Sequence, residues 1–235
     1  MGKQLRLDKL LADTGRWSRK EAKLLLKQGR VQVDGSVEKS GDRKVDPQLA
    51  AVAVDGEVLR WAEFRYLMLH KPGGVLTATE DRRQKTVLDL LPPEYRDLFP
   101  VGRLDKDTEG LLLLTDDGEL AHHLLSPKHH VDKVYLAQIE GEVEEADRVE
   151  FHKGVVLGDG TVCLPAELES LGKGQCLVTL REGKFHQVKR MLASRGKPVV
   201  GLKRLSIGPL KLDETLKPGE FRPLTEEELA EIKQV

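Results

Sequence analysis

The sequence predicts an α+β fold, with a small α/β module over residues 1–60 and a larger sheet domain over residues 61–235. Three observations support this prediction. The chain of 235 residues is long enough for one or two domains. Beyond residue 60, helix and strand patterns intermingle without the regular alternation of a parallel α/β sheet. Before it, two helix patterns are followed by short strands that end in Asp-Gly turns.

The N-terminal module begins with two predicted helices. Leucines at helical spacing mark the first, which ends near Gly15. Ser18 and Glu21 form a capping box that starts the second, and Gly29 ends it. The apolar positions of this helix are Ala22, Leu25 and Leu26, and the basic positions on its other side are Arg19, Lys20, Lys23 and Lys27. Two strands follow, at 30–35 and 52–56, each closing in an Asp-Gly turn.

The second domain follows a connection predicted at residues 56–65. Strands are predicted at 66–69, 111–115, 134–139 and 176–180, with a turn at 71–74. Helices are predicted at 119–125 and 186–195, and the capping box of Thr225 and Glu228 begins a C-terminal helix.

The net charge of −1 hides an uneven distribution. Residues 1–30 hold nine Lys or Arg against three Asp or Glu, and residues 181–204 hold eight against one. Two basic blocks in a nearly neutral chain indicate two surfaces that bind a polyanion, although solvated helix faces are the alternative.

Several other classes of protein fit the sequence poorly. No apolar run reaches the length of a membrane helix, and the N-terminus lacks the apolar core of a signal peptide. Cys163 and Cys176 have no metal or redox spacing and are expected to be buried thiols in a reducing cytoplasm. The histidine pairs at 122–123 and 129–130 lack partners at metal-ligand spacing, so no metal site is predicted.

The order of elements in the first module resembles the S4 RNA-binding domain. The likeness rests on the segments LDKLL at 7–11 and GRVQVDG at 29–35. It implies docking on structured RNA, mainly through phosphate contacts. The residues expected to make those contacts are Arg6, Lys9, Arg19, Lys20, Lys23, Lys27 and Arg30.

Asp105 is the most informative residue of the second domain. It lies in a polar loop directly before the apolar run 111–115, so a buried strand would hold its carboxylate in place. Gly102 and Gly110 flank the loop and are expected to allow close approach of a substrate backbone. The alternative interpretation is a surface turn in which Asp105 caps the backbone.

The segment GRLDKDTEGLLLLTDDG at 102–118 closely resembles the catalytic motif of the RsuA/RluB/RluE/RluF group of pseudouridine synthases. The segments KVY at 133–135 and EGKFHQVKRM at 182–191 resemble two further motifs of that group, in the same order. With the KPGG turn at 71–74, the likeness spans essentially the whole chain. It implies a mixed, mainly antiparallel sheet with a central cleft, and isomerisation of uridine to pseudouridine without a cofactor.

The resemblance also implies roles for individual residues. Asp105 becomes the nucleophile, Tyr135 packs on the target base, and Lys189 is the cation that favours an ionised carboxylate. Most pseudouridine synthases carry Arg at the position of Lys189, and Lys there resembles the small-subunit ribosomal RNA branch. Arg103 either fills the space of the extruded uridine or holds a phosphate. Other RNA contacts in the cleft are expected from Lys184, His186 and Arg190.

The resemblance favours an enzyme that modifies small-subunit ribosomal RNA as a cytoplasmic monomer. Three alternatives remain open at this point: an S4-type RNA-binding assembly factor without activity, a large-subunit ribosomal RNA pseudouridine synthase, and an RNA glycosidase that would release free uracil.

Overall fold

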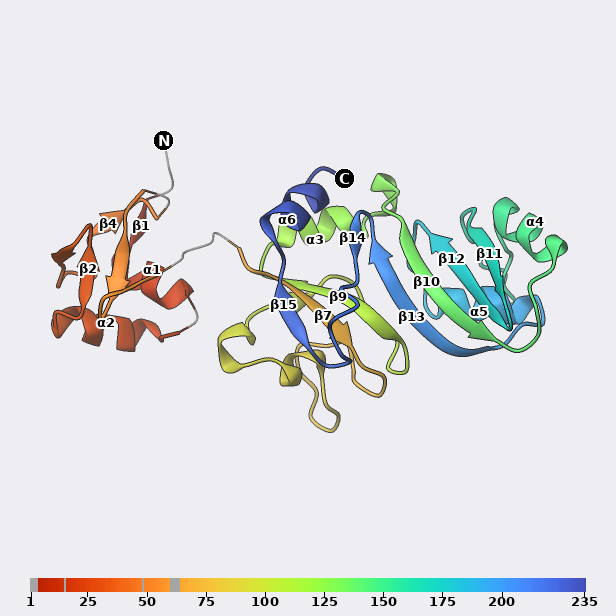
Figure 1. Ribbon diagram of the computed structural model, residues 1–235, viewed down its shortest axis with the longest axis horizontal. Helices are drawn as coiled ribbons and strands as arrows, with labels where there is room; N and C mark the ends of the chain where they lie inside the picture. The colour runs from red at the N-terminus through yellow and green to blue at the C-terminus, as the bar shows by residue number, and fades with distance from the viewer. Residues whose placement is uncertain (1–3, 15, 48, 60–63) are drawn as a thin grey trace. The chain divides into compact units, whose positions relative to one another are not determined.

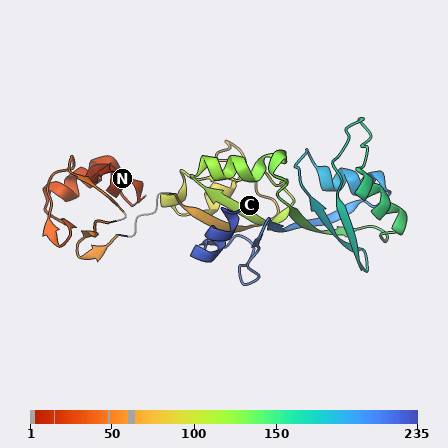
Figure 2. The same cartoon turned by 90° about the horizontal axis from the view of Figure 1, so that it is seen from above.

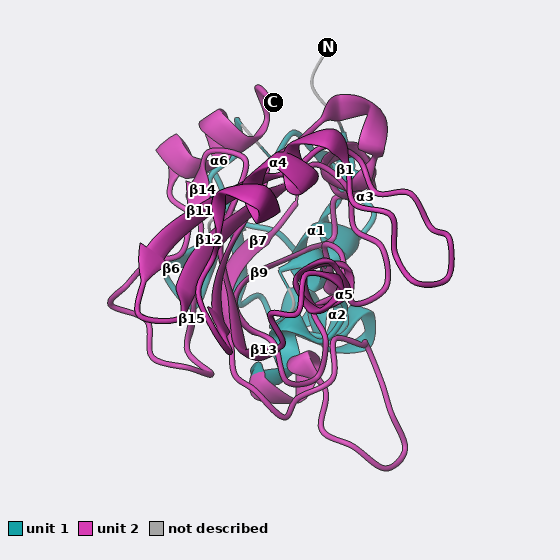
Figure 3. Ribbon diagram, turned by 90° about the vertical axis from the view of Figure 1, so that its right-hand side faces the viewer, with its two compact units in different colours: residues 1–63, 91–97 teal, residues 64–90, 98–235 magenta. Residues whose placement is uncertain are grey.

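The computed structural model describes residues 4–14, 16–47, 49–59 and 64–235. Backbone contacts divide the chain into two compact units, residues 1–63 with 91–97 (unit 1) and residues 64–90 with 98–235 (unit 2; Figure 3). The domain boundary predicted after residue 60, and the helix end predicted at Gly15, lie outside the described residues.

Unit 1 contains the two predicted helices, α1 (Leu7–Asp13) and α2 (Arg19–Lys27; Figure 1). The predicted capping box is present. The amide of Glu21 donates to the hydroxyl of Ser18 over 3.3 Å, and the amide of Ser18 donates to the carboxylate of Glu21 over 2.7 Å. These contacts satisfy two of the amide donors that a helix start leaves unpaired. All four predicted basic positions of α2 are exposed, whereas its apolar positions are buried.

Short antiparallel strands complete unit 1. One sheet has the order β3 (Ser36–Val37), β2 (Val31–Val33), β5 (Val52–Val54), β6 (Glu57–Val58), and β1 (Leu5–Arg6) pairs with β4 (Lys44–Val45). Both predicted Asp-Gly turns are present, and all four of their residues have positive φ, as a tight hairpin requires. The prediction of a plain connection over residues 56–65 was wrong at β6, whose two residues are too few for a visible alternation.

One nine-stranded mixed sheet organises unit 2 (Figure 1). Its main path runs in the order β11 (Glu167–Gly172), β12 (Gln175–Leu180), β10 (Lys133–Ile139), β13 (Val199–Ile207), β9 (Glu109–Thr115), β7 (Tyr66–Lys71), β15 (Phe221–Pro223). Two short strands are added at the sides, β14 (Leu210–Lys211) on β13 and β8 (Phe99–Pro100) on β9. The sheet is mainly antiparallel, as predicted.

The parallel pair of this sheet, β9 with β13, joins its two halves. Its register is short, with Glu109 opposite Lys203 and Gly110 opposite Arg204. A Cβ atom at Gly110 would lie 2.2 Å from the carbonyl oxygen of Arg204, and Gly110 has a φ of +103°. Gly110 is therefore required by the approach of a neighbouring strand. This corrects the expectation that Gly110 admits a substrate backbone.

Helices cover the sheet at both ends. α3 (Gly118–Leu125) and α6 (Glu226–Ile232) share an apolar cluster with β7 and β9. At the other end, α4 (Glu145–Lys153) packs on β11, and α5 (Gln187–Ser194) contacts β13, the strand that follows it (Figure 2). The capping box of Thr225 and Glu228 is confirmed at the start of α6. The described residues contain no helix that is long and apolar enough to cross a membrane.

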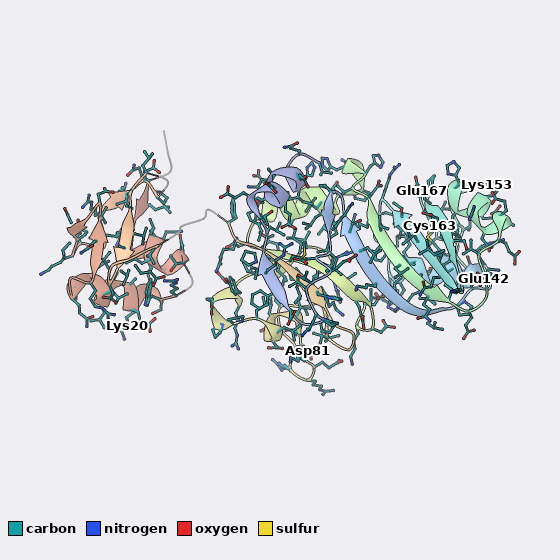
Figure 4. All side chains as sticks on the ribbon, in the orientation of Figure 1. Lys20, Asp81, Glu142, Lys153, Cys163 and Glu167 are labelled. Carbon is teal, nitrogen blue, oxygen red and sulfur yellow. The ribbon has the colours of Figure 1, made fainter. Side chains whose placement is uncertain are left out.

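Both cysteines are buried, free thiols, as predicted. Cys163 lies at the β11–β12 end of the sheet (Figure 4). Burial raises the pKa of the Cys176 thiol to about 11.

Candidate active site

Asp105 lies in the loop between β8 and β9, and buried polar contacts fix the backbone on both sides of it. The hydroxyl of Thr77 donates to the carbonyl of Leu104 over 2.8 Å and accepts from its amide over 3.2 Å. The amide of Gly74 donates to the carbonyl of Lys106 over 2.7 Å. The residues immediately before and after Asp105 are thus held in place by the segment that follows β7.

Lys71 also holds the Asp105 loop in place, through hydrogen bonds to its backbone. Its side chain is fully buried, and its ammonium donates to the carbonyl oxygens of Pro72 (3.0 Å), Lys106 (3.2 Å) and Thr108 (2.8 Å). Burial lowers the pKa of this ammonium to about 8. The sequence interpretation placed Lys71 only in a turn and missed this function, because the acceptors at 106 and 108 are distant in sequence.

The carboxylate of Asp105 meets two basic side chains at the start of α5. Its Oδ2 lies 3.1 Å from Nζ of Lys189, and its Oδ1 lies 3.4 Å from Nε2 of His186. The side chain of Asp105 remains 24% exposed, so it is held by its partners and still open to a substrate. The helix begins at Gln187, one residue later than predicted, because His186 adopts a left-handed backbone conformation.

Lys189 also binds Asp107, over 2.6 Å. Burial alone would lower the pKa of Lys189, but its contacts with Asp107 and Asp105 outweigh burial and raise that pKa. The contact with Lys189 is in turn the main reason why the pKa of Asp107 is lowered. Lys189 is therefore a protonated ammonium that lies between two carboxylates and pairs with both of them.

A pocket of about 70 Å³ opens beside Asp105. Its lining residues come from the Asp105 loop, from β10, β12 and β13, from the segment between β12 and α5, and from the start of α5. They are Arg103, Leu104, Asp105, Thr108, Tyr135, Leu180, Glu182, Gly183, Lys184, His186, Gln187, Val188 and Leu202. Tyr135 is buried, and its strand partner in β13 is Arg204. The pocket thus combines one open carboxylate, one aromatic ring and an apolar side.

Two polar residues of this region were missed by sequence reasoning. Glu182 is buried and accepts hydrogen bonds from the Leu164 amide (2.8 Å) and the Gln187 side chain (2.6 Å). Burial acts to raise the pKa of Glu182, but contacts led by the one from Lys184 lower it overall. Glu182 is thus an ionised anchor and a poor proton donor. Thr108 has a buried hydroxyl without a partner among the described residues.

Of the predicted catalytic and cleft residues, the structure gathers most around this pocket. Asp105, Tyr135, Arg103, Lys184 and His186 line it, and Lys189 contacts Asp105. Lys184 is paired with Glu182, which reduces its availability to a phosphate. Arg190 is not among the residues that line the pocket, and it pairs with Asp159.

Three of the seven predicted RNA contacts of unit 1 surround a carboxylate that sequence reasoning overlooked. The side chain of Asp8 is fully buried. Arg6 binds it over 2.8 Å, and Arg19 and Lys23 lie 3.7 and 3.8 Å away. Of the remaining predicted residues, Lys9 pairs with Asp13, Arg30 pairs with Asp55, and Lys20 and Lys27 are exposed. In the described part of the chain, no group of three or more His, Cys, Asp or Glu could hold a metal ion.

Comparison with known proteins agrees with this architecture. A family model described as RNA pseudouridylate synthase matches residues 65–194, and an S4 domain model matches residues 5–49. The chain belongs to the RNA pseudouridylate synthase family and is an isomerase that acts on RNA.

Relatives of nearly the same length narrow the assignment. The chain is 51% identical to a protein of Bacillus subtilis named uncharacterized RNA pseudouridine synthase YtzG, over 96% of this chain and 97% of that protein. It is 46% identical to ribosomal small subunit pseudouridine synthase A of Vibrio cholerae, over 97% and 99% of the two chains. The protein of the same name in Escherichia coli is 43% identical, over 97% and 100%. A crystal structure of a pseudouridylate synthase matches with a TM-score of 0.69 at 39% identity, covering 97% of this chain and 99% of the other.

Proposed function

We propose that this enzyme isomerises one uridine of small-subunit ribosomal RNA, with Asp105 as the nucleophile. The observation that carries the proposal is the placement of Asp105, whose loop is fixed by buried contacts while its carboxylate faces a pocket beside Lys189. The names of the Vibrio and Escherichia relatives support the small-subunit target.

The chemistry matches the side chains available. The reaction breaks the N1–C1′ bond, turns the base, forms a C5–C1′ bond and releases the C5 proton. It consumes no redox equivalent and no energy source, so a carboxylate that holds the reactive intermediate is the principal requirement. Lys189 keeps this carboxylate paired with a positive charge before and after the reaction.

Access to the carboxylate requires the uridine to leave its stack, at a cost of a few kcal/mol. Tyr135 and the apolar residues of the pocket offer the extruded base a surface to pack on. Arg103 lies in the same lining, where it can occupy the vacated position or hold a phosphate. Unit 1 adds affinity through its basic side chains, mainly at phosphates.

Tritium release tests the proposal. Small-subunit ribosomal RNA containing 5-tritiated uridine would be incubated with the wild type and with Asp105→Asn at matched folding and RNA affinity. Release by the wild type alone supports the proposal, and large-subunit RNA serves as the control for the target. Release of free uracil would instead identify a glycosidase. Tight binding without release, also from a pre-assembled ribonucleoprotein, would identify an assembly factor.

The proposal places the enzyme in the cytoplasm as a monomer. Two buried, unbridged thiols support a reducing compartment. Light scattering of the purified chain tests the monomer, and a molar mass of twice 26.3 kDa would contradict it.

A further inference from the structure

The aromatic ring of Phe185 is unusually exposed. Its relative exposure is 75%, and the other large apolar side chains that are exposed among the described residues are all aliphatic. The ring stacks on the imidazole of His186, with centroids 3.9 Å apart and planes 16° apart. Leaving most of a phenylalanine ring in water forgoes burial that is normally favourable. The ring is therefore available to a binding partner.

The backbone fixes this ring pair in place. His186 has a φ of +49° and a ψ of +34°, a left-handed conformation that costs about 1 kcal/mol for a residue other than glycine. Hydrogen bonds over 3.2 Å and 2.9 Å between Lys184 and Gln187 close the turn around it. The guanidinium of Arg190 donates to the carbonyl of Phe185. A left-handed conformation of this kind persists only when the surrounding hydrogen bonds hold the residue in it.

The two stacked rings, those of His186 and Phe185, lie next to the carboxylate of Asp105, with His186 the nearer of the two. The imidazole of His186 lies 3.4 Å from Asp105 and lines the pocket, and Phe185 stacks on that imidazole. Lys184 precedes Phe185 in the chain, and Arg190 donates to the carbonyl of Phe185. Both are cations, and their carboxylate partners are Glu182 and Asp159. An exposed aromatic ring among cationic side chains is the arrangement by which proteins bind unpaired nucleotides.

We propose that Phe185 is a stacking platform for an unpaired nucleobase that neighbours the target uridine. This inference rests on the proposed function and adds a feature of the substrate, because the platform can be used only by RNA in which a base beside the target is free of its pairing partner. His186 then acts as a positioning residue, which holds the platform next to Asp105.

The test separates the ring of Phe185 from its apolar bulk. Single-turnover tritium release from small-subunit ribosomal RNA would be followed against enzyme concentration for the wild type, Phe185→Leu and Phe185→Tyr. Phe185→Leu should raise the half-saturating enzyme concentration by about 5- to 100-fold, because this is the loss of affinity expected when one base no longer stacks on an aromatic ring. The maximal rate should stay similar to that of the wild type. Phe185→Tyr, which keeps a ring, should remain within about twofold of the wild type.

Two controls sharpen the result. Leu171→Ala removes another exposed apolar side chain, near the end of β11, and should leave both parameters unchanged. The slope of log affinity against log salt should be the same for Phe185→Leu and the wild type, because stacking neutralises no phosphate.

The outcomes distinguish this inference from the proposed function. An unchanged half-saturating concentration in Phe185→Leu, or a fall in the maximal rate alone, would overturn the stacking platform while release by the wild type still supports the isomerase. If the wild type releases no tritium, the proposed function fails. Filter binding of the same RNA then tests whether Phe185 is a stacking platform. Equal RNA affinity of Phe185→Leu and the wild type would overturn that inference.

Discussion

Each unit of the protein contains an aspartate surrounded by basic side chains, and the two aspartates differ in exposure. Asp8 is fully buried beneath Arg6, Arg19 and Lys23. Asp105 contacts Lys189 and His186 but remains 24% exposed at the edge of a pocket. The buried carboxylate can only orient cations, whereas the open one can also react. The same residue type therefore has a structural role in one unit and the proposed nucleophilic role in the other.

The largest effect is expected from removing the open carboxylate. Asp105→Asn should lower the single-turnover rate by about 10⁴-fold or more, since the proposed nucleophile is removed. RNA affinity and urea stability should change little, because the side chain of Asp105 is partly exposed. Asp8→Asn is the matched variant, and an equal loss of rate in both would refute the contrast between the two carboxylates.

The cation beside Asp105 should have the next largest effect. Lys189→Gln should lower the rate by about 100-fold, the usual consequence of deleting one electrostatic contact at a reacting group. Lys153→Gln makes the same change of charge on α4, where the ammonium pairs only with exposed Glu150. A rate for Lys189→Gln that matches this control would show that Asp105 works without its lysine.

Lys71 tests whether a reactive carboxylate needs a rigid loop. Lys71→Met should destabilise the protein by about 3 kcal/mol in urea unfolding, because three backbone carbonyls lose their buried donor. The rate at saturating RNA should also fall, since the loop of Asp105 is no longer held. Full stability in Lys71→Met would show that the loop is fixed by Thr77 and Gly74 alone.

Asp8→Asn should cost about 2 kcal/mol of stability, with a pH dependence that identifies the cause. Folding lowers the pKa of Asp8, chiefly through the hydrogen bond from Arg6, from an unfolded value of about 3.8. The ionised carboxylate therefore stabilises the folded chain above pH 4, and this contribution is lost as the pH falls through the lowered pKa. The stability gap between wild type and Asp8→Asn should close below pH 4, and a constant gap would contradict the mechanism.

The sequence predicted local features well and distant contacts poorly. The capping boxes at Ser18 and Thr225 were predictable because both partners lie three residues apart. Asp105 and Lys189 were predicted as site residues, although their distance of 3.1 Å depends on the whole sheet. Strand β13 was missed because its basic residues obscure any alternation. Asp8, Lys71 and Glu182 were missed because burial of a charge becomes visible only when its partners are in place.

The short parallel pairing of β9 with β13 determines when the site around Asp105 can form during synthesis of the chain. Asp105 precedes β9, whereas its partners His186 and Lys189 precede β13. The contacts around Asp8 come from Arg6, Arg19, Lys23 and the carbonyl of Gly41, all within the first 41 residues. A growing chain can therefore form the cationic cluster of unit 1 long before β13 joins β9 at Gly110. The cationic cluster of unit 1 is therefore complete before the pocket around Asp105 can form.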